Sequence, residues 1–384
     1  MKTRREFLTS TAAGGIAGII AYGVAPAFAK EVGDKKDITL EQAWKVHKKC
    51  LIIDGHNDTP VERVARKENP LNWMKRDPSY QTDIPRMKEG GQQYGGFFIV
   101  GNGLIANVWV TSERVMEQIE KYPKDIMKVL SSKDMVQAGK TGRVGVMMSI
   151  ESGAKWLEGR LETLHILYRL GVRLVNISHG EGGSDPASLQ GTPSLSGRCT
   201  DEQREDNRKN AVGLTPFGLE VLKEENELCI VTDTAHINDK AFYDVMEHST
   251  LPPIMSHTAV FSLGRHARCM TDDQIKALKA RSGVMGIMFV PGFLDPDPKK
   301  GNIDRVVEHI LYVRDMVGID TVGIGTDYDG TTSIVSEVPD ISKLVNLTQC
   351  MLAHGLTEEE IRKIWGGNFL RILEQTIDIP VKKK

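Results

Sequence analysis

Short apolar runs alternate with longer segments of helical periodicity along most of the chain. The apolar runs are rich in β-branched residues and seldom alternate with polar positions, as expected for parallel strands buried on both faces. We predict strands at residues 51–54, 95–100, 144–150, 173–178, 229–234, 253–256, 284–290 and 321–325. We predict helices at residues 112–138, 154–170, 216–227, 239–247, 272–280, 303–317, 340–354 and 358–374.

This order of elements predicts an α/β protein built as a single (β/α)₈ barrel of the TIM type. Eight strands with interleaved helices over this length are typical of that fold. A doubly wound open sheet is the structural alternative. However, no GxGxxG or GxxxxGK[ST] stretch indicates a dinucleotide or P-loop site. We therefore expect one barrel domain over residues 30–384.

One long segment, residues 180–210, does not fit the alternation of strand and helix. It is rich in Gly, Ser, Pro, Asp and Arg and shows no clear periodicity. It is too long for an ordinary connection and follows the fourth predicted strand. Two interpretations remain open: a lid or insertion over the barrel mouth, or a mobile surface loop.

Residues 1–29 have the features of a bacterial export signal. Arg4 and Arg5 form a twin-arginine pair, and a weakly apolar stretch follows at residues 12–25. The Ala-Phe-Ala sequence at residues 27–29 fits the small-x-small cleavage rule. The apolar stretch is short and Gly-rich for a transmembrane helix. We expect the twin-arginine export machinery to deliver the folded protein to the periplasm, with no stable membrane span after the signal is removed.

Composition narrows the choice of partners. The chain has 384 residues, of which 40% are hydrophobic and 26% charged, as in an ordinary soluble globular protein. The formal net charge is −2 and no block of Lys or Arg occurs, so we expect no nucleic-acid partner. The five cysteines show no CxxC spacing, which argues against a zinc ribbon or a thioredoxin-like site.

Side chains of the kinds that bind metals stand at the ends of most predicted strands. In chain order they are His56, Asp58, Glu151, His179, His236, His257 and Asp327. In a barrel of this type the carboxyl ends of the strands meet at one face, where catalytic groups are found. Neutral imidazoles and carboxylates are ligands of zinc and similar divalent ions. The pattern therefore predicts a metal site at the barrel mouth.

The ligand set suffices for two ions if one carboxylate is shared. If Glu151 bridges two ions, the first ion also takes His56 and Asp58. The second ion takes His236 and His257. Each ion then has three protein ligands and an open position, as catalytic sites require. Two ions about 3.5–4 Å apart can share a hydroxide and stabilise a tetrahedral intermediate. We expect zinc, although ligand type alone also allows manganese or cobalt.

At these residues the chain resembles the membrane (renal) dipeptidase family of dizinc metallopeptidases. The resemblance covers most of residues 30–384. Its matching blocks are residues 53–58, 81–86, 149–153, 213–218, 233–236, 256–257 and 323–330. The resemblance implies a (β/α)₈ barrel, a dinuclear zinc site and hydrolysis of dipeptides, often with a D-residue at the C-terminal side. Some family members also open β-lactam rings.

The resemblance implies the same metal ligands and adds substrate-binding roles. His179 matches a family histidine that steadies the developing oxyanion. Asp327 matches the aspartate that holds the substrate amine or shuttles a proton. Arg268, eleven residues after His257, matches the arginine that grips the substrate carboxylate, and Arg265 is a nearby alternative. The stretch after His179 departs from the family pattern, which leaves the choice of substrate open.

The sequence thus predicts metal-dependent hydrolysis of dipeptides by a hydroxide shared between two ions. Grips on the carboxylate and the amine would measure the length of the substrate and favour dipeptides. One alternative is a related amidohydrolase that acts on N-acyl amino acids or lactams. Another is a catalytically inactive binding protein on the same barrel. Family members are often dimers, which leaves a homodimer open.

Overall fold

The computed structural model describes residues 35–67, 71–91, 93–101 and 105–381, so the expected export signal lies outside the described residues. The strands are β1 (Ile52–Asn57), β2 (Tyr94–Gly101), β3 (Ile126–Lys128), β4 (Val144–Ile150), β5 (Val172–Asn176), β6 (Val231–Asp233), β7 (Ile254–Thr258), β8 (Val284–Ile287) and β9 (Val322–Ile324).

Helices precede, connect and follow the strands. They are α1 (Leu40–His47), α2 (Thr59–Ala65), α3 (Ile84–Gly90), α4 (Ile105–Lys121), α5 (Ser132–Lys140), α6 (Gly153–Leu157), α7 (Leu161–Leu170), α8 (Asp201–Asn210), α9 (Pro216–Glu227), α10 (Asp239–His248), α11 (Phe261–Gly264), α12 (Asp272–Ala280), α13 (Pro291–Leu294), α14 (Ile303–Val317), α15 (Leu344–Ala353), α16 (Glu358–Arg362) and α17 (Asn368–Thr376). Shorter turns are η1 (Pro298–Lys300), η2 (Ile319–Thr321), η3 (Ile341–Lys343) and the π-helical η4 (Lys363–Gly367).

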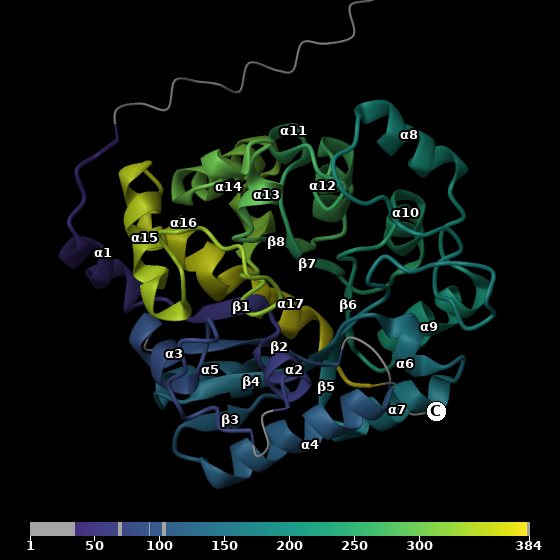
Figure 1. Cartoon of the computed structure of the whole chain (residues 1–384), viewed down its shortest axis with the longest axis horizontal. Helices are drawn as coiled ribbons and strands as arrows, with labels where there is room; N and C mark the ends of the chain where they lie inside the picture. Colours follow the sequence, from purple (N-terminus) through teal and green to yellow (C-terminus); the bar gives the residue numbers. More distant parts are fainter. Residues whose placement is uncertain (1–34, 68–70, 92, 102–104, 382–384) are drawn as a thin grey trace, which may run out of the picture. The chain divides into compact units, whose positions relative to one another are not determined.

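The parallel strands close into a barrel, which confirms the predicted fold (Figure 1). The order around the barrel is β1, β2, β4, β5, β6, β7, β8 and β9, and β9 pairs with β1 again. Asp54 of β1 pairs with Ile324 of β9, and β2 pairs with β4 along its length. The remaining strand, β3, pairs with residues 144–146 of β4 outside this ring.

Two of the predicted helices are wrong as single units. The predicted helix at 112–138 is divided, because α4 ends before Pro123 and is followed by β3 and α5. Proline disfavours a helical conformation in the residue before it and cannot donate the next helical hydrogen bond. The predicted helix at 154–170 breaks at Glu158 and Gly159, whose φ angles of 52° and 71° are left-handed.

The barrel interior is filled at the amino end of the strands. Buried side chains from seven of the barrel strands form one cluster with three residues of α17. Its strand members are Ile53, Phe97, Met147, Leu174, Val231, Ile254 and Val284, and its α17 members are Phe369, Ile372 and Leu373. The C-terminal helix therefore closes this end with apolar side chains, and polar groups are left for the opposite end.

Close backbone approach around Ser256 requires glycine at Gly286 in β8 and at Gly325, which directly follows β9. A Cβ atom at Gly325 would lie 1.9 Å from the Ser256 carbonyl oxygen, and one at Gly286 would lie 2.1 Å from it. These distances leave no room for a side chain, so the two glycines allow the backbone at Ser256 to approach their own backbone closely. This packing fixes the backbone next to His257.

Helix α1 is anchored through a buried histidine. Nε2–H of His47 donates to the Gly90 carbonyl at 2.6 Å. The Thr348 hydroxyl accepts from Trp365 Nε1–H at 2.8 Å and donates to His47 Nδ1 at 2.7 Å. Burial lowers the pKa of His47 to about 4. The histidine is therefore neutral at physiological pH, with both ring nitrogens hydrogen-bonded.

The 180–210 segment contains a helix that the sequence pattern did not predict. Thr200 and Gln203 form a capping box at the start of α8, and the helix packs beside α10 (Figure 1). Across the part of the chain that the structure describes, no helix is both long and apolar enough to cross a membrane. All five cysteines lie in that part and carry free thiols.

Candidate metal centre

The predicted strand-end residues meet around Glu151, which follows β4 directly. Its Oε1 atom lies 3.1 Å from Nε2 of His236, 3.8 Å from Nε2 of His257 and 3.9 Å from Nε2 of His56. Its Oε2 atom lies 4.0 Å from Nε2 of His179. The imidazoles come from β1 and β7 and from the loops after β5 and β6. The barrel thus brings together side chains from four separate segments.

Asp58 and Asp327 complete the cluster on the side of His56. Nε2 of His56 lies 3.0 Å from Oδ2 of Asp58. The ligand atoms of His56, Asp58 and Asp327 all lie within 4.8 Å of one another. Asp327 and His236 have left-handed φ angles of 63° and 66°. Such conformations are costly for non-glycine residues and are often found at functional sites.

The donor set fits divalent metal ions. Oε1 of Glu151 is buried and accepts no hydrogen bond from any described residue. Beside it, the Nε2 atoms of His236 and His257 face each other at 2.8 Å. An orphaned carboxylate oxygen next to converging imidazole nitrogens is the arrangement that a divalent ion satisfies. His56 and Asp58 form a second group of candidate ligands, on another side of Glu151.

The electrostatics favour cation binding. Burial, together with the charges of Arg268 and the other histidines, lowers the pKa of His236 and His257 well below the usual value. Both imidazoles are therefore uncharged at neutral pH. Burial disfavours a charge on His56, but the carboxylates of Asp58 and Glu151 outweigh it and raise the pKa of His56 to about 10. In the protein alone a proton thus compensates the excess negative charge, and a bound cation would replace it.

Asp327 is a carboxyl group of the site whose pKa lies near neutrality. Burial raises its pKa, as do the neighbouring carboxylates of Asp58 and Glu151, whereas His56 and Arg268 lower it, and the net pKa is about 7. A buried carboxyl group with a pKa near neutrality is able to take up and release protons.

A relay of buried hydrogen bonds orients His257. Oγ of Ser256 donates to Oδ2 of Asp233 at 2.6 Å and lies 2.8 Å from Nδ1 of His257. Because the single hydroxyl proton goes to the carboxylate, the hydroxyl oxygen accepts Nδ1–H, and the Nε2 lone pair faces Glu151. Such outer hydrogen bonds fix the tautomer and the orientation of ligating histidines.

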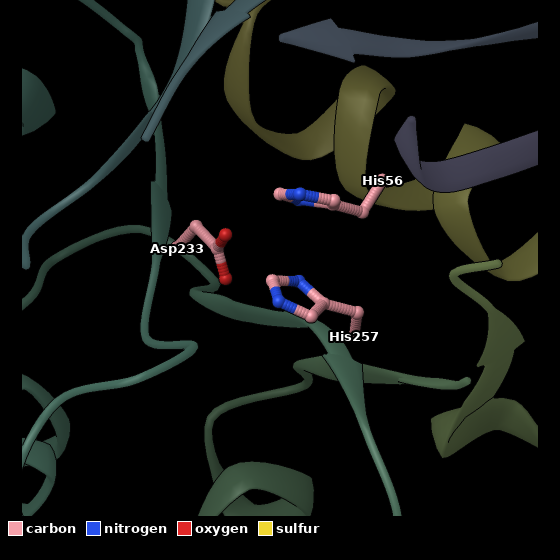
Figure 2. Close-up of side chains that lie close together, drawn as sticks. All are labelled: His56, Asp233 and His257. Atoms are coloured by element: carbon pink, nitrogen blue, oxygen red, sulfur yellow. The ribbon is translucent and has the colours of Figure 1, made fainter. Parts of the chain in front are cut away.

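Asp233 itself points toward the imidazoles of His56 and His257 (Figure 2). The rings of His56 and His257 lie 3.8 Å apart between centroids. The Asp233 carboxylate already accepts the backbone N–H groups of Ala235 and Ser256 at 3.0 and 2.9 Å, besides the Ser256 hydroxyl. Asp233 therefore helps to fix the orientation of His257 through the Ser256 hydroxyl.

The contacts of Asp233 and Ser256 were not predicted, although both residues stand in the blocks that carry the family resemblance. Asn176 was not predicted either, and its amide joins the loops next to Glu151 and His236. Nδ2 of Asn176 donates to the Ala235 carbonyl at 2.5 Å, and its Oδ1 accepts Ser152 N–H at 3.1 Å. The available signal was an amide side chain directly after the apolar residues Leu174 and Val175 of β5.

The structure distinguishes the two candidate arginines. Arg268 donates from a guanidinium nitrogen to the His257 carbonyl at 3.3 Å, and its charge acts on Glu151 and Asp327. Arg265 instead pairs with Asp201 of α8 at 2.8 Å, and its side chain is 44% exposed. Arg268 therefore belongs to the centre, and Arg265 lies on the outer surface.

Another group of metal-ligand types lies away from the barrel mouth. Asp304, Cys350 and His354 come together at the ends of α14 and α15. Oδ1 of Asp304 accepts from Lys35 Nζ at 2.6 Å, from His354 at 2.9 Å and from Cys350 at 3.2 Å. The lysine ammonium already supplies a positive charge there, so this group is explained as an ion pair.

Comparison with known proteins identifies the family. A family model described as membrane dipeptidase (peptidase family M19) matches residues 40–383. The chain belongs to the membrane dipeptidase family. This confirms the resemblance that the strand-end residues indicated.

Individual members of the membrane dipeptidase family and related structures agree with this assignment. Dipeptidase tcpJ of Claviceps purpurea is 29% identical over 271 residues, which is 70% of this chain, and the chain spans 60% of the length of that relative. The crystal structure of dipeptidase AC, a metallopeptidase of family M19, is 25% identical with a TM-score of 0.77 and covers 86% of this chain and 99% of that one.

A metallopeptidase from Rhodobacter sphaeroides, solved with a phosphinate mimic of L-Ala-D-Ala, shares the fold. It is 24% identical with a TM-score of 0.76, and the match covers 85% of this chain and 99% of that one.

Proposed function

We propose that the protein is a metal-dependent dipeptidase that hydrolyses dipeptides, including those with a C-terminal D-residue. The observation that carries the proposal is the orphaned Oε1 of Glu151, surrounded by imidazole nitrogens at 3.1–3.9 Å in a chain of the membrane dipeptidase family. This donor set suits a hydrolytic metal centre, and the family gives the substrate class.

Two ions would be held by the two halves of the cluster, with Glu151 shared. His56 and Asp58 would complete one site, and His236 and His257 the other. Zinc or a similar divalent ion bound there would lower the pKa of a water molecule and polarise the scissile carbonyl group. The orientation of His257 by Ser256 supports this assignment, because it directs a lone pair toward the shared carboxylate.

Three side chains near the cluster would act on the substrate directly. Asp327 would accept the proton of the attacking water and pass it to the leaving amine nitrogen. His179, whose side chain is 48% exposed beside Glu151, would donate a hydrogen bond to the developing oxyanion. Arg268 would bind the terminal carboxylate through its planar fork.

The test is hydrolysis of a small substrate panel by the mature protein. L-Ala-L-Ala, L-Ala-D-Ala and N-acetyl-L-Ala-D-Ala are each assayed with the protein as purified, after chelation and after zinc is restored. Chelator-sensitive, zinc-restored cleavage of the two free dipeptides alone is expected. Cleavage of the acetylated compound would indicate a broader amidohydrolase. Bound metal without any turnover would indicate a binding protein.

We also propose that the twin-arginine pair directs the protein to the bacterial periplasm. Arg4 and Arg5 support this, together with the small-x-small sequence at residues 27–29. The test is fractionation of cells that express the wild type or the R4K/R5K variant. Loss of the periplasmic pool in the variant is expected, and an unchanged pool would exclude this route.

A further inference from the structure

The segment of residues 180–210 holds the loop that carries Arg268. Ala267, the residue before Arg268, has both backbone groups bonded to this segment. Its N–H donates to the Gly197 carbonyl at 2.9 Å, and its carbonyl accepts from Nη1 of Arg204 at 2.5 Å. Arg198 of the same segment also donates to the Gly264 carbonyl. The loop is thus fixed from outside the barrel.

Arg204 spans the gap between this loop and the barrel helices. Its side chain is 7% exposed. Nη2 donates to Oδ1 of Asp239 at 2.6 Å and to Oε1 of Gln274 at 2.8 Å, while Nη1 reaches Ala267. Asp239 begins α10 and Gln274 lies in α12. Nη2 of Arg204 is therefore bonded to the barrel helices, and Nη1 is bonded to the loop that carries Arg268.

The backbone of Arg268, next to Ala267, is also held by hydrogen bonds. Its N–H donates to Nδ1 of His266 at 3.1 Å, and its carbonyl accepts from the Thr258 hydroxyl at 2.8 Å. A cavity of about 20 Å³, enough for one water molecule, is lined by Arg204, His236 and Arg268 among others. If the hold on Ala267 were lost, the loop and Arg268 would have space into which to shift.

We propose that Arg204 is a positioning residue that sets the preference for a free C-terminal carboxylate through Arg268. The inference rests on the proposed dipeptidase function and extends it, because it makes the segment of residues 180–210 a determinant of specificity. Two-pronged recognition of a carboxylate by a guanidinium depends on geometry, so a displaced Arg268 discriminates poorly between a carboxylate and an amide.

The test compares L-Ala-D-Ala with its C-terminal amide, following release of L-alanine from both. Arg204→Lys keeps a positive charge beside Asp239, but one ammonium cannot replace a fork that reaches two sides. The matched control is Arg208→Lys, one turn along α8, where the arginine is 43% exposed and pairs with Glu205 and Asp273. Arg268→Gln sets the limit of lost discrimination.

We expect Arg204→Lys to raise KM for the free acid about tenfold. It should leave kcat/KM for the amide and the metal content unchanged, and Arg208→Lys should match the wild type. Unchanged selectivity in Arg204→Lys, or an equal loss for both compounds, would overturn the inference while the dipeptidase function stands. Unchanged selectivity in Arg268→Gln would overturn it as well. A wild type that cleaves neither compound would refute the proposed function itself.

Discussion

Replacing Ser256 by alanine removes the hydroxyl that joins Asp233 to His257. The change deletes two hydrogen bonds, of 2.6 Å to the carboxylate and 2.8 Å to Nδ1 of the imidazole. Without an acceptor for Nδ1–H, the ring is free to rotate and to exchange tautomers. Nε2 then no longer presents a fixed lone pair to Glu151.

The size of the effect on metal binding and stability depends on the hydrogen bonds that S256A retains. Loss of a partner that orients a ligating histidine typically weakens metal binding about 10–100-fold. Asp233 keeps its bonds from the backbone N–H groups of Ser256 and Ala235, so its carboxylate is not left bare. Of the two bonds lost, the one to the Asp233 carboxylate should by itself contribute about 1.5–3 kcal/mol to the free energy of unfolding.

The assay measures zinc retained after dialysis against graded chelator concentrations, followed by activity at saturating zinc. We expect S256A to lose zinc at a chelator concentration about 10–100-fold lower than the wild type does. Its kcat should largely recover when zinc is in excess. The control is T234V, which removes a buried hydroxyl that donates at 2.7 Å to the Ile254 carbonyl and not to a ligand. Equal zinc retention by S256A and the wild type would refute the relay.

Three further substitutions test the site and the fold. Glu151→Gln should lose both tightly bound ions and reduce kcat/KM about a hundredfold or more. Glu225→Gln is the matched control, since burial raises the pKa of Glu225 to about 8 and its side chain is already neutral at pH 7. Normal metal content in Glu151→Gln, measured by elemental analysis, would exclude a bridging role.

As the pH falls below 6.5, the unfolded chain protonates His47 before the folded one, whose pKa of about 4 is lower. The wild type should therefore lose up to about 3 kcal/mol of stability between pH 6.5 and 4. Urea unfolding should show a smaller loss in His47→Gln, and parallel curves would contradict this. Gly325→Ala should lower the thermal midpoint of unfolding strongly, because the added Cβ would lie 1.9 Å from the Ser256 carbonyl oxygen. Gly292→Ala is the control, since a Cβ added there would meet no non-neighbouring described atom within 4 Å. Equal midpoints would refute the packing argument.

The barrel and the convergence of its candidate ligands were predictable because their signals are local and repeated. Each buried strand is a short apolar run, and the candidate ligands follow these runs at the same end. His56, Glu151 and His257 can therefore be recognised in the sequence, and the topology of a parallel barrel brings them together. Their distances to one another and the orphaned oxygen of Glu151 needed the structure.

The supporting residues were not predictable for a physical reason. Ser256 and His257 are adjacent, and a strand directs neighbouring side chains to opposite faces. The bond between them depends on local χ angles and on the close approach that Gly325 permits. Helix α8 was missed because its sequence, DEQREDNRKN, has no apolar stripe. Only its capping box marked it, and its two buried residues, Arg204 and Asn207, are both polar.

The central claim is that metal bound around Glu151 carries out hydrolysis of a dipeptide. Its most direct test is a zinc titration of metal-free protein while the hydrolysis of L-Ala-D-Ala is followed. We predict no activity without metal and a rise that saturates at about two equivalents of zinc per chain. Full activity of the metal-free protein, or no activity at any zinc concentration despite stoichiometric binding, would contradict the account.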